Sequence, residues 1–107
     1  MFSFARFLAR QADHSEKVFG PKSRWKSVLD HIRKELAEIE RKPDDLEEWI
    51  DVMLLAFDGA RRATGAEPED IVAALLAKQT KNEGRVWPDW RTVPDGVAIE
   101  HVRGEQD

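Results

Sequence analysis

The feature that most constrains this sequence is a pair of helical patterns joined by a short turn, between Trp25 and Arg62. In the first pattern, apolar residues recur every three or four positions, as they do along one face of an α-helix. This stripe consists of Trp25, Val28, Leu29, Ile32, Leu36 and Ile39. Pro43 lies in the segment that follows and suits a tight reversal of the chain. We therefore expect two antiparallel helices, one from Ser23 or Arg24 to Arg41 and one from Asp44 to about Thr64.

Each of these two helices carries a pair of acids three residues apart, Glu35 with Glu38 and Glu48 with Asp51. That spacing puts both acids of a pair on one side of a helix, one turn apart. Folding the hairpin would gather four carboxylates, whose mutual repulsion favours a bound cation. Oxygen ligands without any cysteine suit Mg²⁺, with Mn²⁺ as a second possibility. The alternative is that the pairs are solvated faces of an acid-rich protein.

Composition sets the class of protein. A chain of 107 residues with 41% hydrophobic and 36% charged residues is typical of one folded, highly charged domain. We expect that domain to span residues 1–107, with 98–107 as a peripheral tail. A net charge of −4 argues against binding to polymeric nucleic acid. The sequence contains neither a membrane-spanning apolar run nor a signal peptide, so we expect no membrane association and a cytoplasmic location.

The remaining segments also have helical patterns. A first helix is expected over Phe2–Phe19, with Ser3 as its N-cap. A fourth helix, opened by Pro68, is expected from Glu69 to about Glu83, with four apolar residues facing inward. Those residues are Ile71, Val72, Leu75 and Leu76. The fold class expected is therefore all-α, a bundle of about four helices.

The third helix is expected to begin at Asp44, with Glu47 completing a capping box. It is apolar nearly all round between Trp49 and Phe57, which predicts burial on more than one side. On its polar stripe, Asp58 either binds a further metal ion or pairs with Arg62, and we favour the ion pair.

The order of these motifs resembles the all-α NTP pyrophosphohydrolase superfamily, which includes MazG and the dimeric dUTPases. Four blocks carry a closer likeness: FARFLARQADHSEKVFGP, LDHIRKELAEIE, DDLEEWIDVMLLAFDGARRA and AKQTKNEGRVWPDWR. Together they look like the phage-associated dATP/dGTP diphosphohydrolase family, which is related to MazZ. The resemblance covers roughly Phe2 to Arg103.

The resemblance implies Mg²⁺-dependent hydrolysis of a deoxynucleoside triphosphate, with dGTP and dATP favoured, to the monophosphate and pyrophosphate. It implies that the quartet Glu35, Glu38, Glu48 and Asp51 holds the metal and carries the catalysis. It also implies a homo-oligomer, either a dimer or a tetramer, and the host cytoplasm if the chain is phage-encoded. Two other functions stay open: a dUTPase-like or house-cleaning pyrophosphatase, and a non-catalytic helical adaptor with an acidic binding face.

Cationic and polar residues are needed for the substrate, because the acids themselves repel a triphosphate. Lys78, Asn82 and Arg85 follow at i, i+4 and i+7, so all three can face one way. They are the first candidates for the phosphates and the sugar, although cations at a helix C-terminus are also common without a ligand. Further candidates are His14 and Lys17 for the base or phosphate, and Trp87 for stacking. A core position for His14 and an anchoring role for Trp87 are the simpler alternatives.

Overall fold

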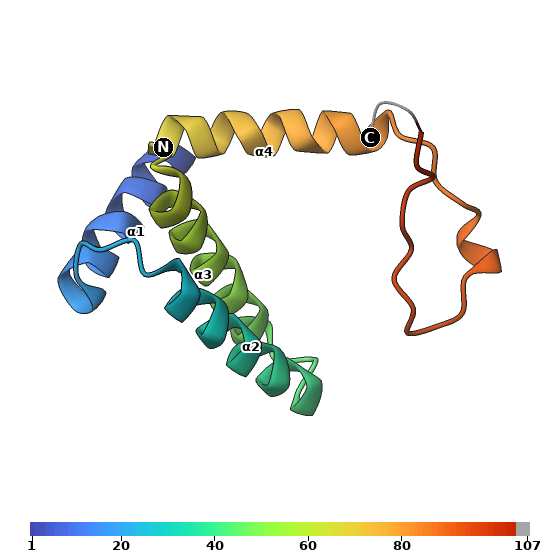
Figure 1. The fold of residues 1–107 in the computed structure, drawn as a ribbon, viewed down its shortest axis with the longest axis horizontal. Helices are drawn as coiled ribbons and strands as arrows, with labels where there is room; N and C mark the ends of the chain where they lie inside the picture. The colour runs from blue at the N-terminus through green and yellow to red at the C-terminus, as the bar shows by residue number, and fades with distance from the viewer. Residues whose placement is uncertain (105–107) are drawn as a thin grey trace. The chain divides into compact units, whose positions relative to one another are not determined.

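The computed structural model describes residues 1–104 of the chain and contains four α-helices and one short 3₁₀ helix there (Figure 1). No residue of this described part forms a β-strand. The helices are α1 (Phe4–Phe19), α2 (Trp25–Arg41), α3 (Leu46–Thr64), α4 (Pro68–Glu83) and the 3₁₀ helix η1 (Trp90–Thr92). The expected all-α fold class is confirmed.

The chain divides into two compact units, Met1–Ala73 and Ala74–Asp107. In the first unit, α2 and α3 lie side by side and antiparallel, and α1 packs on α3 (Figure 1). Gly59 lets α2 and α3 approach closely, because a Cβ atom built there would lie 3.0 Å from Cγ1 of Val28. Val28 is only 2% exposed and has little room to move. The hairpin expected from the apolar stripe is therefore present.

The helix ends follow the expected local chemistry with two corrections. Ser3 caps α1 by accepting a hydrogen bond from the backbone N–H of Arg6, so the helix begins at Phe4 and not at Phe2. The N-cap of α3 is Asp45 and not Asp44, because the Asp45 side chain accepts from the backbone N–H of Glu47. Gly65 ends α3 in the left-handed conformation, with φ 74°.

α3 packs on both α1 and α2, so the expected burial on more than one side is present, although Trp49 and Met53 are each 50% exposed. One expectation about burial is wrong for the single chain. On α4, Leu75 is 42% and Leu76 is 68% exposed, although both were expected to face inward. Among its described residues, the second unit has no other α-helix to cover that face of α4. One chain therefore leaves part of its apolar helix faces exposed.

The second unit contains the end of α4 and the segment that follows it. The chain passes through η1 and returns, so that the backbone N–H of Val102 donates to the Val86 carbonyl at 2.7 Å. The edge of the Trp87 ring meets His101, with the ring centroids 5.7 Å apart. The part of the expected tail that the structure describes, residues 98–104, therefore folds back on residues 86 and 87. Residues 105–107 of that tail lie outside the described part.

A buried ion-pair network joins α1 to α3. The Asp58 carboxylate accepts hydrogen bonds from the Ser15 hydroxyl at 2.8 Å and from Arg62 Nε at 2.9 Å. It also accepts one from Arg61 Nη2 at 2.9 Å, and Arg61 Nη1 in turn donates to Glu16 at 3.0 Å. The side chains of Asp58 and Arg62 are 6% and 2% exposed. Asp58 therefore pairs with Arg62, as favoured from the sequence.

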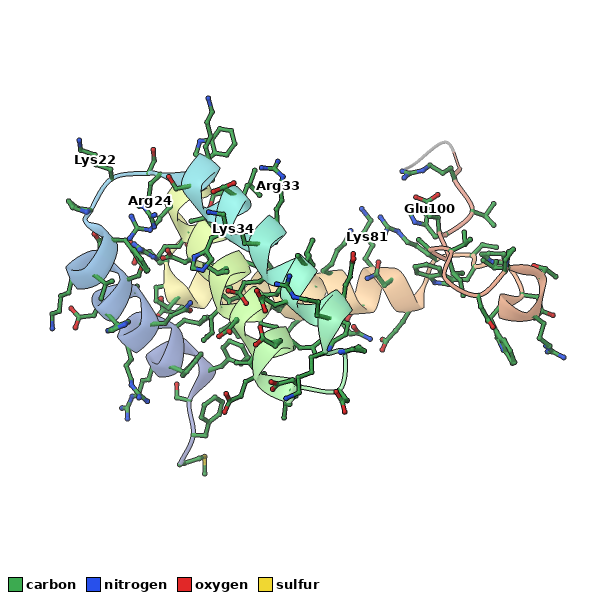
Figure 2. All side chains as sticks on the ribbon, turned by 90° about the horizontal axis from the view of Figure 1, so that it is seen from below. Lys22, Arg24, Arg33, Lys34, Lys81 and Glu100 are labelled. Carbon is green, nitrogen blue, oxygen red and sulfur yellow. The ribbon has the colours of Figure 1, made fainter. Side chains whose placement is uncertain are left out.

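The same network reaches the connection between α1 and α2, on which Lys22 and Arg24 lie (Figure 2). Arg62 Nη1 donates to the backbone carbonyl of Lys22. Arg24 adopts a left-handed conformation, with φ 32°, and its guanidinium stacks over the Phe19 ring at 4.6 Å. The connection is thus fixed to α3 on one side and to the end of α1 on the other.

We predict that Asp58→Asn destabilises the protein by about 3 kcal/mol at pH 7, because it leaves the buried guanidinium group of Arg62 without its anion, whereas Arg61 keeps Glu16. Burial alone would raise the pKa of Asp58, but hydrogen bonds from Ser15, Arg61 and Arg62 outweigh it and hold that pKa below its ordinary value of 3.8. A lowered carboxyl pKa contributes stability above the unfolded-state value, and that contribution is lost as the pH falls through the folded-state value. Urea unfolding at several pH values measures the difference.

The matched control is Asp13→Asn, which removes the exposed ion pair between Asp13 and Lys17. An exposed pair of this kind contributes at most about 1 kcal/mol. Equal losses in the two variants, or a loss at Asp58 that does not shrink as the pH falls below the ordinary carboxyl range, would contradict this account of the network.

Candidate functional site

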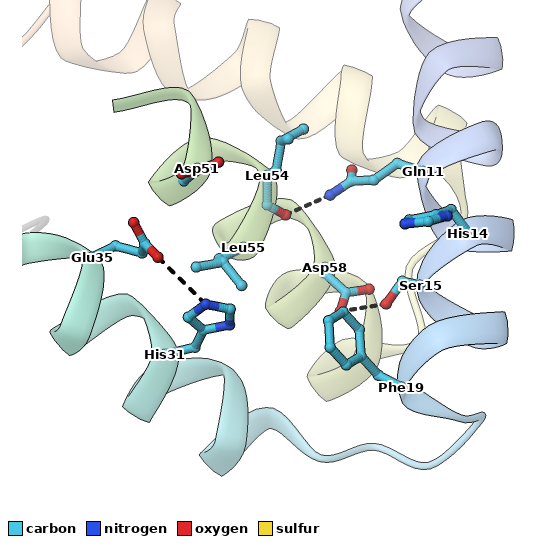
Figure 3. A pocket seen from close by; sticks show the side chains of 10 residues that line it. All are labelled: Gln11, His14, Ser15, Phe19, His31, Glu35, Asp51, Leu54, Leu55 and Asp58. Carbon is cyan, nitrogen blue, oxygen red and sulfur yellow. Dashed lines mark hydrogen bonds and ion pairs between the residues drawn. The ribbon is translucent and has the colours of Figure 1, made fainter. Parts of the chain in front are cut away.

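A pocket of about 360 Å³ opens among α1, α2 and α3 of the first unit (Figure 3). Glu35 and Asp51 lie on one side of it, and Gln11 and His14 of α1 lie on the opposite side. Leu54 and Leu55 of α3 line the space between them, so the pocket has an acidic end and an apolar wall. The remaining lining residues are Ser15, Phe19, His31 and Asp58.

Three acids of the expected quartet come together at the acidic end. Glu35 of α2 and Glu48 and Asp51 of α3 each offer a carboxylate oxygen, and these oxygens lie within 4.8 Å of one another. The Glu35 side chain is 17% exposed, whereas Asp51 is exposed. The antiparallel hairpin produces this cluster, because it sets the middle of α2 against the first turns of α3. Such a group of oxygens could bind a metal ion.

The cluster perturbs the protonation of its own members. The pKa of Glu48 is raised, first by partial desolvation and then by a hydrogen bond with Glu35. The negative charges of Glu35, Asp45 and Asp51 act in the same direction. The neighbouring negative charges thus favour the protonated form of Glu48, whereas a bound cation would favour the charged form.

Glu38, the fourth acid of the quartet, is not part of this cluster. It lies one turn beyond Glu35 on α2, and its carboxylate pairs with Arg41 on the same helix. Both side chains of that pair are exposed, at 50% for Glu38 and 67% for Arg41. The assignment of Glu38 as a metal ligand stays a prediction.

Two pocket residues were missed in the sequence. His31 Nε2 lies 3.4 Å from Glu35 Oε1, one helical turn earlier on α2. Gln11 of α1 donates from Nε2 to the backbone carbonyl of Leu54. The i, i+4 spacing of His31 and Glu35 was a usable signal, since such residues are neighbours on a helix. Gln11 offered no such signal, because its partner is 43 positions away in the chain.

The two substrate-binding candidates on α1 differ in position. His14 lines the pocket, and its imidazole is exposed rather than part of the core. Lys17 does not line the pocket, and its ammonium forms an exposed ion pair with Asp13 at 3.0 Å. Of these two residues, only His14 is brought to the acidic cluster's pocket.

The other four candidates belong to the second unit. Lys78 is exposed on α4, and Arg85 Nη1 donates to the Asn82 side chain at 2.9 Å. The indole Nε1 of Trp87 donates to the backbone carbonyl of Asn82 at 2.8 Å. Asn82 thus organises the end of α4, and Trp87 anchors the segment that follows it.

None of the helices in the described part of the chain is long and apolar enough to span a membrane.

Comparison with known proteins gives one match. A family model described as dATP/dGTP pyrophosphohydrolase matches residues 7–106, which is nearly the whole chain. No curated protein and no solved structure matches the chain. The match covers the pocket, the carboxylate cluster and the polar end of α4. The chain therefore belongs to the dATP/dGTP pyrophosphohydrolase family and is an enzyme that hydrolyses a deoxynucleoside triphosphate to the monophosphate and pyrophosphate.

Proposed function

We propose that this enzyme is Mg²⁺-dependent, that it prefers purine deoxynucleoside triphosphates, and that it works at the acidic end of the pocket. The observation that carries the proposal is the convergence of Glu35, Glu48 and Asp51 within 4.8 Å. Three carboxylates held that close would repel one another strongly without a proton or a cation among them. The family match indicates a polyanionic substrate, and without a metal ion these acids would repel its phosphates.

The donor set fits the proposed ion. Mg²⁺ prefers oxygen ligands, retains waters, and takes its remaining ligands from substrate phosphates. In our proposal Glu35, Glu48 and Asp51 would hold the ion, which when bound would neutralise the triphosphate and lower the pKa of a water. His31, whose Nε2 lies 3.4 Å from Glu35 Oε1, is proposed to help orient that carboxylate.

Glu38 is proposed to join the site when metal and substrate are present. Its present partner is Arg41, and both side chains are largely exposed. Breaking an exposed ion pair costs at most about 1 kcal/mol, so the pair is no obstacle to a change of partner. Glu38 is also one helical turn from Glu35, which keeps it on the same side of α2.

Lys78, Asn82 and Arg85 are proposed to bind the phosphates and the sugar of the substrate. Their cationic and amide groups have the chemistry that a triphosphate requires, and Arg85 and Asn82 are already hydrogen-bonded to each other. His14 is proposed to contact the base or the α-phosphate, since it lines the pocket. Lys17 and Trp87 complete the set as weaker contributors. We treat residues 1–107 as one functional domain, in keeping with the family match over 7–106.

One prediction of this proposal concerns the metal. Purified enzyme should release pyrophosphate from dGTP and dATP with Mg²⁺ and should stop when the ion is chelated. Glu48→Gln and Asp51→Asn should each lower kcat/KM by at least about 100-fold, because each removes a charged ligand. Glu48→Gln should also be slightly more stable than the wild type without metal, since it relieves repulsion in the cluster.

The control is Glu47→Gln, an exposed acid beside Glu48 that is not in the cluster. It should retain wild-type turnover. Hydrolysis that persists in both cluster variants would reject the assigned site. A substrate panel that includes dUTP and dCTP separates the purine preference from a dUTPase-like activity, and no hydrolysis of any of them would favour the adaptor function.

We further propose that the enzyme is a homo-oligomer, either a dimer or a tetramer. In the described part of one chain, only four apolar side chains are buried: Leu8, Val28, Ile39 and Ile71. Trp25, Leu29 and Leu36 of α2 are instead 42–46% exposed. Two of them line an apolar groove with Ile32 and the small residues of α3. A small domain with so little core gains stability by covering such a surface with a second copy.

A further prediction concerns this assembly. Light scattering should give a mass of two or four times 12.3 kDa for the wild type. Leu29→Glu puts a charge into the groove and should shift the protein toward the monomer, whereas Arg33→Glu, at an exposed position of the same helix, should not. A wild-type mass of one chain would overturn the proposal.

A further inference from the structure

The pocket has a second polar feature at the end opposite the carboxylates. Gln11 of α1 lines this end, across Leu54 and Leu55 from Glu35 and Asp51 (Figure 3). If the triphosphate is held at the acidic end, as proposed above, the base extends along the apolar wall toward α1. The groups that face it there are the side chains of Gln11, His14 and Phe19.

The amide of Gln11 has a fixed orientation. Its Nε2 lies 2.5 Å from the backbone carbonyl oxygen of Leu54. A carbonyl oxygen only accepts hydrogen bonds, so the amide nitrogen and not the amide oxygen must face it. The remaining group of the side chain, Oε1, is therefore a pure acceptor whose direction is set by the contact with α3.

This acceptor is available to a ligand. Gln11 Oε1 accepts no hydrogen bond from any residue of the described part of the chain. It is also not among the buried unpartnered polar atoms, so solvent reaches it. An accessible acceptor beside an apolar wall favours a ligand that brings a hydrogen-bond donor to that position.

We propose that Gln11 is a specificity-determining residue whose Oε1 accepts a hydrogen bond from the donor edge of the purine base, chiefly from its exocyclic amino group. Adenine carries its amino group at C6 and guanine carries its own at C2 beside N1–H, so the two bases reach the same acceptor in different orientations of the purine ring. A base without such a donor leaves Oε1 desolvated and unpaired, which costs affinity. This proposal rests on the proposed function, because it assumes that the triphosphate lies at the carboxylates.

The test compares dATP and dGTP with purine 2′-deoxyriboside triphosphate, which lacks every donor on the six-membered ring. The wild-type enzyme should prefer dATP and dGTP over this analogue by about tenfold in kcat/KM. Gln11→Met keeps the length of the side chain and removes the acceptor. It should lower kcat/KM for dATP and dGTP by about tenfold and change the value for the analogue by less than about twofold.

The control is Arg10→Met, at an exposed position of the same helix, which should leave all three values unchanged. Helix content of each variant, measured by circular dichroism, shows that α1 remains folded.

The outcomes separate the two proposals. An equal loss on all three substrates in Gln11→Met, or no loss on any, overturns the role of Gln11 and leaves the metal site intact. A wild-type enzyme that hydrolyses none of the three with Mg²⁺ overturns the proposed function, and the role of Gln11 falls with it.

Discussion

The mutual repulsion of three carboxylates is the constraint on which the site depends. Glu35, Glu48 and Asp51 come from two helices, so their proximity is produced by tertiary packing and not by local sequence. Partial desolvation, a hydrogen bond with Glu35 and the neighbouring negative charges all raise the pKa of Glu48. The packing of α2 on α3 must therefore supply the stability that the cluster removes. The close approach at Gly59 and Val28 is one source of it.

A further acid on α3 has the opposite environment. Asp58 lies two turns after Asp51 on α3, yet it is buried and surrounded by Ser15, Arg61 and Arg62. Its pKa is lowered where that of Glu48 is raised. Asp58 is neutralised by the protein itself and joins α1 to α3, whereas the three clustered acids could bind a metal ion. The network thus holds α1 on α3, and α1 carries Gln11 and His14 on the side of the pocket opposite the carboxylates.

Sequence patterns predicted the parts of this structure that depend on neighbouring residues. Contacts within a few positions of the chain determine most helix bounds and the Ser3 cap. They also determine the end of α3 at Gly65 and the pairing of Asp58 with Arg62. The errors arose where adjacent residues compete, as at Asp44 and Asp45, or where burial depends on what covers a helix, as at Leu75 and Leu76. Gln11 was missed because its role depends on a carbonyl of another helix. The identity of the family was accessible from four motif blocks, since it requires no geometry.

The most direct test of the carboxylate cluster is to locate a divalent ion in the protein itself. Crystals grown with Mn²⁺ and a non-hydrolysable purine deoxynucleotide should show an anomalous-scattering peak at about 2.0–2.3 Å from oxygens of Glu35, Glu48 and Asp51. The triphosphate should lie next to that peak, on the side of the ion that faces away from the three carboxylates. Absence of the peak, with the three carboxylates still clustered and the nucleotide bound elsewhere, would contradict the account.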